Sequence, residues 1–109
     1  MKLFHCTPFY LGQKVTFQPR RVVDYLPNWE GEMERVEEFA VCLSDSTEGW
    51  KVTPKCNGST VYIYCVEIAE EEVRYINAWP ITTNPHGPKI REYRVYRPIE
   101  GYFYRRIKY

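Results

Sequence analysis

Two segments near the ends of the chain carry the side chains best suited to chemistry. The first, LFHCTP at 3–8, places His5 and Thr7 at the end of a predicted strand, where an imidazole and a hydroxyl can both hydrogen-bond a sugar hydroxyl. The second, KIREYRVYRPIEG at 89–101, sets Glu92 among arginines near the start of a late strand, where side chains most easily face a cleft. Two plainer interpretations stay open: a histidine satisfied by neighbouring backbone, and a solvated strand glutamate.

Short apolar and β-branched runs predict the strands that must position these side chains. The strand candidates are residues 2–6, 14–18, 39–44, 60–68, 72–76, 91–96 and 102–109. The run TVYIYCVEI at 60–68 is apolar on both alternating faces, so it is the best candidate for a central strand. The turn RPIEG predicts a hairpin between the last two strands, with Gly101 supplying freedom in φ. The first strand should lie beside one of these two, which would bring His5 toward Glu92.

Helical signals are few. Good helix formers at 32–38 predict one or two turns, and Ser44, Asp45 or Ser46 could cap a second short helix. The prolines in NAWPITTNPHGPK predict a long irregular loop between residues 77 and 89. The expected fold is therefore a single α+β, β-rich domain over residues 1–109. Its sheet would be antiparallel or mixed, with one or two short helices.

Composition narrows the class of protein further. The chain has 109 residues, of which 44% are hydrophobic and 17% aromatic, so it can bury one modest core. No apolar run approaches the ~20 residues of a membrane span, and we expect a cytoplasmic protein without membrane contact. Its four cysteines are expected to be reduced. No CxxC pair occurs, so we expect no metal site.

A net charge of +1 hides a marked asymmetry along the chain. Residues 28–48 carry seven acids against one arginine, whereas residues 89–109 carry seven Lys or Arg against two glutamates. Two interpretations stay open. Either both segments are solvated faces that keep the protein soluble, or the basic segment forms a face for nucleic acid or for a phosphate-bearing cofactor.

Three segments taken together resemble the catalytic blocks of ADP-ribosyltransferases of the diphtheria-toxin and poly(ADP-ribose) polymerase group. These segments are LFHCTP, FAVCLSDSTEGW and REYRVYRPIEGYFYRRIKY. In that family a first strand of the form LxHG(S/T) supplies a histidine for the NAD ribose. A middle strand passes through serines into a helix, and a late strand of the form EYIVYD begins with the catalytic glutamate. The closest local match is EYRVY at 92–96.

The resemblance implies an ADP-ribosyltransferase-like fold and a role for each matching residue. His5 would bind NAD and take part in catalysis, and Thr7 and Ser44 would help to bind NAD. Glu92 would orient a ribose hydroxyl and stabilise the cation that develops as nicotinamide leaves. Arg20 could reach the pyrophosphate with its guanidinium fork, although a surface arginine is the commoner outcome. The family's nicotinamide-stacking aromatic falls at or near Cys42, so Trp50 or a tyrosine would have to replace it.

Other chemistries find less support. Neither GxGxxG nor GxxxxGK(S/T) occurs, and Cys6 points away from His5 on the same strand. The first hypothesis is therefore transfer of ADP-ribose from NAD to an acceptor, which could be protein, nucleic acid, a small molecule or water. The alternative is a non-catalytic β-rich module that binds a nucleotide, nucleic acid or protein. For nucleic acid the candidate surface is a basic C-terminal hairpin with stacking aromatics. These are Tyr93, Tyr96, Tyr102, Phe103 and Tyr104.

Overall fold

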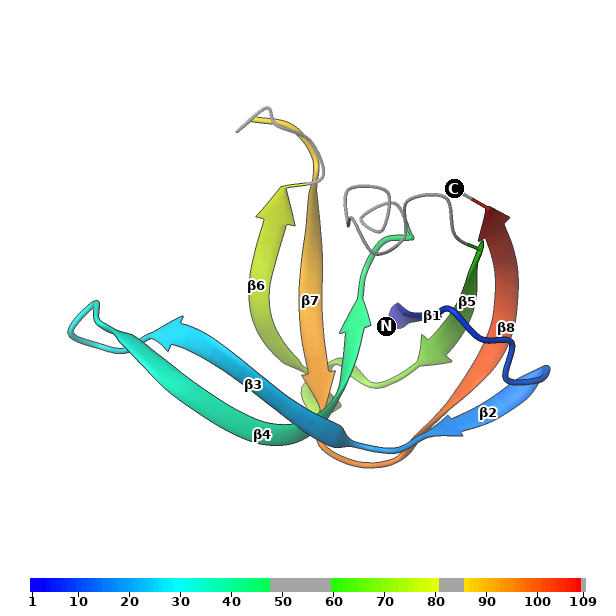
Figure 1. Cartoon of the computed structure of the whole chain (residues 1–109), viewed down its shortest axis with the longest axis horizontal. Coiled ribbons are helices and arrows are strands. Elements are labelled where there is room, and N and C mark those ends of the chain that lie inside the picture. Colours follow the sequence, from blue (N-terminus) through cyan, green and yellow to red (C-terminus); the bar gives the residue numbers. More distant parts are fainter. Residues whose placement is uncertain (48–59, 81–85, 109) are drawn as a thin grey trace.

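A computed structural model describes residues 1–47, 60–80 and 86–108, and β-strands make up nearly all of the regular structure in these ranges (Figure 1). The strands are β1 (Lys2–Thr7), β2 (Lys14–Phe17), β3 (Arg20–Pro27), β4 (Met33–Ser44), β5 (Thr60–Glu67), β6 (Arg74–Pro80), β7 (Lys89–Val95) and β8 (Ile99–Lys108). A single 3-10 turn, η3 (Glu70–Glu72), is the one helical element in the described residues. The β-rich domain is confirmed.

The strands form one antiparallel sheet. Its order is β2-β8-β5-β1-β4-β7-β6, and β3 pairs with β4 outside this path. β1 lies inside the sheet as expected, but its neighbours are β4 and β5. The prediction that β1 lies beside a C-terminal strand is therefore wrong, because β4 separates it from β7 and β5 separates it from β8.

The β3–β4 hairpin forms an arm that projects from the rest of the sheet (Figure 1). Its register runs from Arg20 opposite Ala40 to Pro27 opposite Met33. β4 then continues into the main sheet, where its last residues pair with β7. The radius of gyration is 14.5 Å. A compact domain of this length would have about 13 Å, and the projecting arm is consistent with the larger value.

The prediction of a short helix over residues 32–38 is wrong, because 33–38 belong to β4. The turn that precedes them reverses the chain. Asn28 Oδ1 accepts hydrogen bonds from the backbone N–H groups of Glu30 and Glu32, both at 3.0 Å, and Gly31 has a φ of 81°. Pairing with β3 then outweighs the helix propensity of the glutamates.

The predicted C-terminal hairpin is also wrong. β7 and β8 follow each other in sequence, but β7 pairs with β4 and β6, while β8 pairs with β2 and β5. Gly101 has no positive φ. It is a glycine for a different reason: a Cβ there would lie 2.5 Å from Cε2 of Phe17 and 3.4 Å from Cβ of Tyr64.

Two apolar clusters cover the two faces of the sheet, and β5 contributes to both. The larger contains Leu3, Phe17, Val41, Leu43, Tyr64, Val66, Ile68, Val95 and Ile99. The smaller contains Cys6, Val61 and Ile63. The prediction that the run at 60–68 is a central strand covered on both faces is confirmed.

The structure describes only part of the residues on which the other sequence predictions depend. β6 extends to Pro80, so the predicted loop over 77–89 is shorter than expected, and 81–85 lie outside the described residues. The second helix, predicted to begin after a cap at 44–46, would run into residues 48–59, which lie outside the described residues together with Trp50 and Cys56. Cys42 and Cys65 are free thiols. No helix among the described residues is long and apolar enough to cross a membrane.

Candidate functional site

A mostly apolar pocket of about 650 Å³ lies where β1, β2, β3 and β4 meet. Its apolar lining includes Leu11, Val15, Phe17, Val22, Ala40 and Val41. Its polar lining includes His5, Thr7, Thr16, Gln18 and Arg20. Three side chains predicted from the sequence to bind a cofactor, His5, Thr7 and Arg20, therefore meet in one pocket.

The His5 side chain connects β1 to β4 next to the point where the two strands pair. The two strands are paired at Phe4 and Ser44, and at the next position the His5 ring reaches Cys42 instead, with Nδ1 2.9 Å from the carbonyl oxygen. A carbonyl oxygen only accepts, so Nδ1 carries the proton and Nε2 is the acceptor in the neutral ring. Phe17 packs against the ring with centroids 4.3 Å apart. The plainer interpretation of His5, a ring satisfied by backbone, thus describes one of its two nitrogens.

Burial lowers the pKa of His5, the hydrogen bond to Cys42 opposes this shift, and the positive charge of Arg20 lowers the pKa further. The unfolded chain therefore binds a proton at a higher pH than the folded chain. Stability from this group is fully present above the unfolded pKa and is lost as pH falls toward the folded pKa. At neutral pH the imidazole is uncharged.

We expect this linkage to appear in His5→Asn, whose side-chain amide can keep the bond to the Cys42 carbonyl but cannot titrate. Between about pH 7.5 and about pH 5, the unfolding free energy of the parent protein should fall more than that of the variant. Urea denaturation at both pH values measures the two differences. Equal losses in parent and variant would show that burial of His5 does not favour its neutral form.

Arg20 and Thr7 stand at the two strand ends beside the pocket. Arg20 begins β3 opposite Ala40, and its charge is near enough to lower the pKa of His5. The Thr7 hydroxyl accepts a hydrogen bond from the backbone N–H of Phe9 at 3.2 Å. Its own hydrogen stays available to donate to a ligand.

Cys42 also lines the pocket, at the position where the resemblance places a stacking aromatic. Burial and, to a smaller extent, the negative charges of Glu92 and Glu38 together raise the pKa of its thiol to about 11. The group is therefore a neutral thiol near pH 7 and a poor nucleophile. The aromatic wall comes instead from Phe17, which the sequence analysis did not single out.

Ser44 and Glu92 are not among the side chains that line this pocket. Ser44 is buried at the end of β4, and its hydroxyl donates to the Ser46 carbonyl at 3.0 Å. Glu92 stands opposite Ser44 on β7, and Ser44 stands opposite Phe4 on β1. These three side chains share one face of the sheet, and successive residues alternate in direction. His5, next to Phe4, therefore points to the other face.

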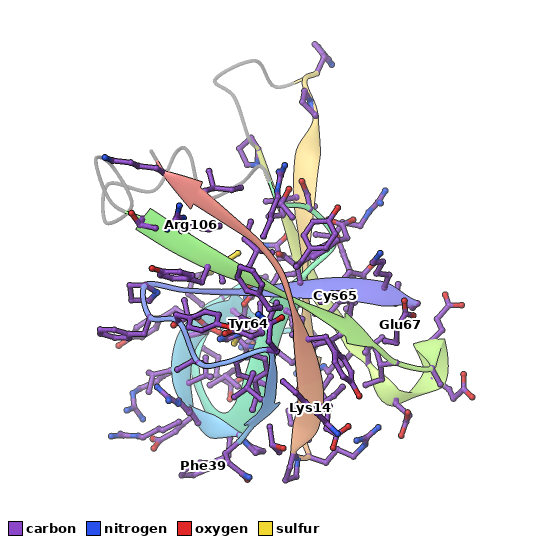
Figure 2. All side chains as sticks on the ribbon, turned by 90° about the vertical axis from the view of Figure 1, so that its right-hand side faces the viewer. Lys14, Phe39, Tyr64, Cys65, Glu67 and Arg106 are labelled. Carbon is purple, nitrogen blue, oxygen red and sulfur yellow. The ribbon has the colours of Figure 1, made fainter. Side chains whose placement is uncertain are left out.

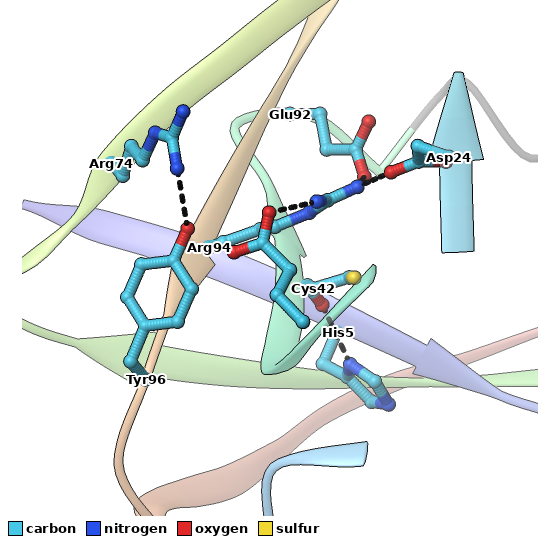
Figure 3. A network of polar contacts seen from close by, with 8 residues as sticks. His5, Asp24, Cys42, Arg74, Glu92, Arg94 and Tyr96 are labelled. Carbon is cyan, nitrogen blue, oxygen red and sulfur yellow. Dashed lines mark hydrogen bonds and ion pairs between the residues drawn. The ribbon is translucent and has the colours of Figure 1, made fainter. Parts of the chain in front are cut away.

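Glu92 belongs to a charge cluster centred on Arg94 (Figure 3). The Arg94 side chain is only 1% exposed. Its Nη1 donates to Glu38 Oε1 at 2.7 Å, its Nη2 forms an ion pair with Asp24, and Nη2 lies 3.8 Å from Glu92 Oε1. Burial lowers the pKa of Arg94. Because Asp24 and Glu38 belong to the arm, this arginine connects the arm to the main sheet.

The sequence pattern predicts the strands that carry these residues but not their roles in the cluster and the pocket. Tyr93 and Val95 face the larger core cluster, so alternation along the strand turns Arg94 to the other face of the sheet. Arg94 is buried there because the arm covers it, which the strand's own sequence does not indicate. The Phe17 and Gln18 contributions to the pocket lie in KVTFQPRR, which predicts a strand but shows no polar motif.

Comparison with known proteins finds no match to this chain among protein-family models, curated proteins or solved structures. A function for the pocket must therefore be argued from its geometry and chemistry.

Proposed function

We propose that this chain is a binding module whose pocket takes a small nucleotide-like ligand, with a planar apolar part and an acidic group. The observation that carries the proposal is that His5, Thr7 and Arg20 line one largely apolar cavity of about 650 Å³. Ligand pockets of proteins typically have ~300–1,000 Å³ and an apolar wall with a few polar groups that orient the ligand. NAD and related nucleotides belong to this ligand class.

Three of the residues that line the pocket would have distinct roles in such a complex. Phe17, packed between His5 and Tyr64, forms part of the apolar wall beside a base or nicotinamide ring. His5 presents Nε2, an acceptor for a ribose hydroxyl or an amide N–H, because Nδ1 is committed to Cys42. Arg20 can hold a phosphate with two parallel N–H donors.

Binding without turnover is the better supported form of this function. Transfer of ADP-ribose would need Glu92 and His5 on the same ligand, whereas Glu92 faces Arg94 and His5 faces Phe17. ADP-ribosyltransferase activity remains a prediction of the sequence resemblance. Release of nicotinamide from NAD that is lost in Glu92→Gln would support it.

We expect NAD, ADP-ribose or AMP to raise the melting temperature, and uncharged adenosine to raise it less. A ligand at about 100 times its Kd stabilises the folded state by about 2.7 kcal/mol. Arg20→Gln should remove most of the shift caused by the phosphate-bearing ligands. Arg97→Gln is the matched control, because Arg97 is exposed and pairs with Glu72 at 2.9 Å, away from the pocket.

Three results would contradict the proposal. One is the absence of a shift with any of these ligands at millimolar concentration. Another is a shift that Arg20→Gln and Arg97→Gln change equally, which would indicate a general charge effect. The third is an equal shift with adenosine and AMP, which would remove the role of Arg20.

A further inference from the structure

A β-bulge in β8 arranges its side chains in a way that simple alternation would not. Tyr64 of β5 stands opposite Phe103, and the preceding residue Ile63 stands opposite Arg105. Tyr104 is therefore the extra residue of the bulged strand. A bulge of this kind turns neighbouring side chains toward the same side of a sheet.

The result is one exposed aromatic and basic surface, which we call the Tyr102–Tyr104 platform. It consists of Lys2, Lys14, Tyr102, Tyr104 and Arg105. Tyr102 is 51% exposed and Tyr104 is 48% exposed. The Tyr104 ring rests on Phe4, with centroids 5.2 Å apart, which fixes its position. Figure 2 looks onto this end of the molecule, with β8 crossing the view past Lys14 and Cys65.

Cations flank both rings. Lys14 Nζ lies 5.8 Å from the centroid of Tyr102. Lys2 Nζ lies 5.4 Å and Arg105 Cζ 5.9 Å from the centroid of Tyr104. Exposed aromatic faces beside cations are the elements with which proteins stack unpaired bases and hold the adjoining phosphates.

Two glutamates lie beside the platform and reduce its positive charge. Glu100 forms an ion pair with Lys14 at 3.4 Å and accepts a hydrogen bond from the Tyr102 hydroxyl at 3.3 Å. Glu67 stands opposite Lys2. Beyond Arg105, β8 continues with Arg106 and Lys108, which stand opposite Tyr62 and Thr60 and therefore point to the other face of the sheet. The positive charge of the platform therefore comes from Lys2, Lys14 and Arg105.

The three other aromatics of the predicted stacking surface do not belong to the platform. Phe103 and Tyr93 pack against the larger core cluster. Tyr96 accepts a hydrogen bond from Arg74 at 3.3 Å, on another part of the sheet.

We propose that the Tyr102–Tyr104 platform binds single-stranded nucleic acid. Two successive bases stack on Tyr102 and Tyr104, and Lys2, Lys14 and Arg105 hold the phosphates. Duplex DNA is excluded as the preferred partner because its bases are already stacked on one another. None of the platform residues lines the pocket, so this site is independent of the proposed nucleotide pocket.

The test is fluorescence anisotropy of a labelled oligothymidine of about 12 nucleotides, titrated with the whole chain. Tyr102→Ala and Tyr104→Ala should each weaken binding by about 5- to 150-fold, and Tyr102→Phe should retain it. With three phosphate contacts, raising NaCl from about 50 to about 200 mM should weaken binding by about 20-fold. The matched controls are Tyr25→Ala and Trp29→Ala, exposed aromatics on the acidic arm that should change binding less than twofold.

A variant with Lys2→Gln, Lys14→Gln and Arg105→Gln keeps both rings and should lose affinity and most of the salt dependence. It provides the test if the alanine variants fail to fold. No binding at about 50 mM salt would overturn the proposal. Three other results would also overturn it. These are unchanged affinity in both alanine variants, an equal loss of affinity in the Tyr25→Ala and Trp29→Ala controls, and equal affinity for duplex DNA.

Discussion

Arg94→Met should lower the free energy of unfolding by about 3–5 kcal/mol, the largest single-residue effect that we expect in this chain. Arg94 is 1% exposed and is the cation shared by Asp24, Glu38 and Glu92. Methionine fills much of the same volume but leaves the three carboxylates facing one another without a counter-charge. Urea denaturation followed by tryptophan fluorescence measures the loss.

The matched control is Arg74→Met. Arg74 is exposed and donates one hydrogen bond to the Tyr96 hydroxyl, so its loss should cost less than about 1 kcal/mol. A triple change, Arg94→Met with Asp24→Asn and Glu38→Gln, should recover part of the stability because it removes the unpaired charges. An Arg94→Met loss no larger than that of Arg74→Met would show that the cluster does not hold the arm to the sheet.

The Arg94 cluster also shows where sequence patterns stop being informative. β5 was predictable because Val61, Ile63 and Val66 need apolar partners on both faces, and that demand is local to the strand. β3 and the first half of β4 were not. Their alternating residues are partly polar on both faces, and Asp24 and Glu38 become inward-facing only because an arginine from β7, far along the chain, reaches them.

Sequence proximity was likewise a poor guide to strand pairing at the C-terminus. The short connection between β7 and β8 favours a hairpin, but β5 and β2 take both edges of β8. Because β7 pairs with β4, Glu92 lies beside Ser44. The strands β4 and β1 separate β7 from β5, which is the neighbour of β8. The pocket was more accessible to prediction, because His5, Thr7 and Arg20 lie at strand ends, where polar side chains of different strands can meet.

Gly101→Ala should lower the free energy of unfolding by about 1–3 kcal/mol, although alanine removes backbone entropy from the unfolded chain. The added Cβ would lie 2.5 Å from Cε2 and 3.2 Å from Cδ2 of Phe17, and 3.4 Å from Cβ of Tyr64. Phe17 is buried between Tyr64 and His5, so its ring has little room to move away.

The same change should weaken ligand binding in the pocket, because Phe17 forms part of its wall. Phe17→Leu in the Gly101→Ala background is the decisive variant. A smaller side chain relieves the clash, so the double variant should lose less stability than the sum of the two single losses, with a coupling of about 0.5–3 kcal/mol. Urea denaturation of the four proteins gives this coupling. Additive losses, or a Gly101→Ala protein as stable as the parent, would contradict the close contact between β8 and the Phe17 ring. The glycine would then be explained by neither backbone conformation nor packing.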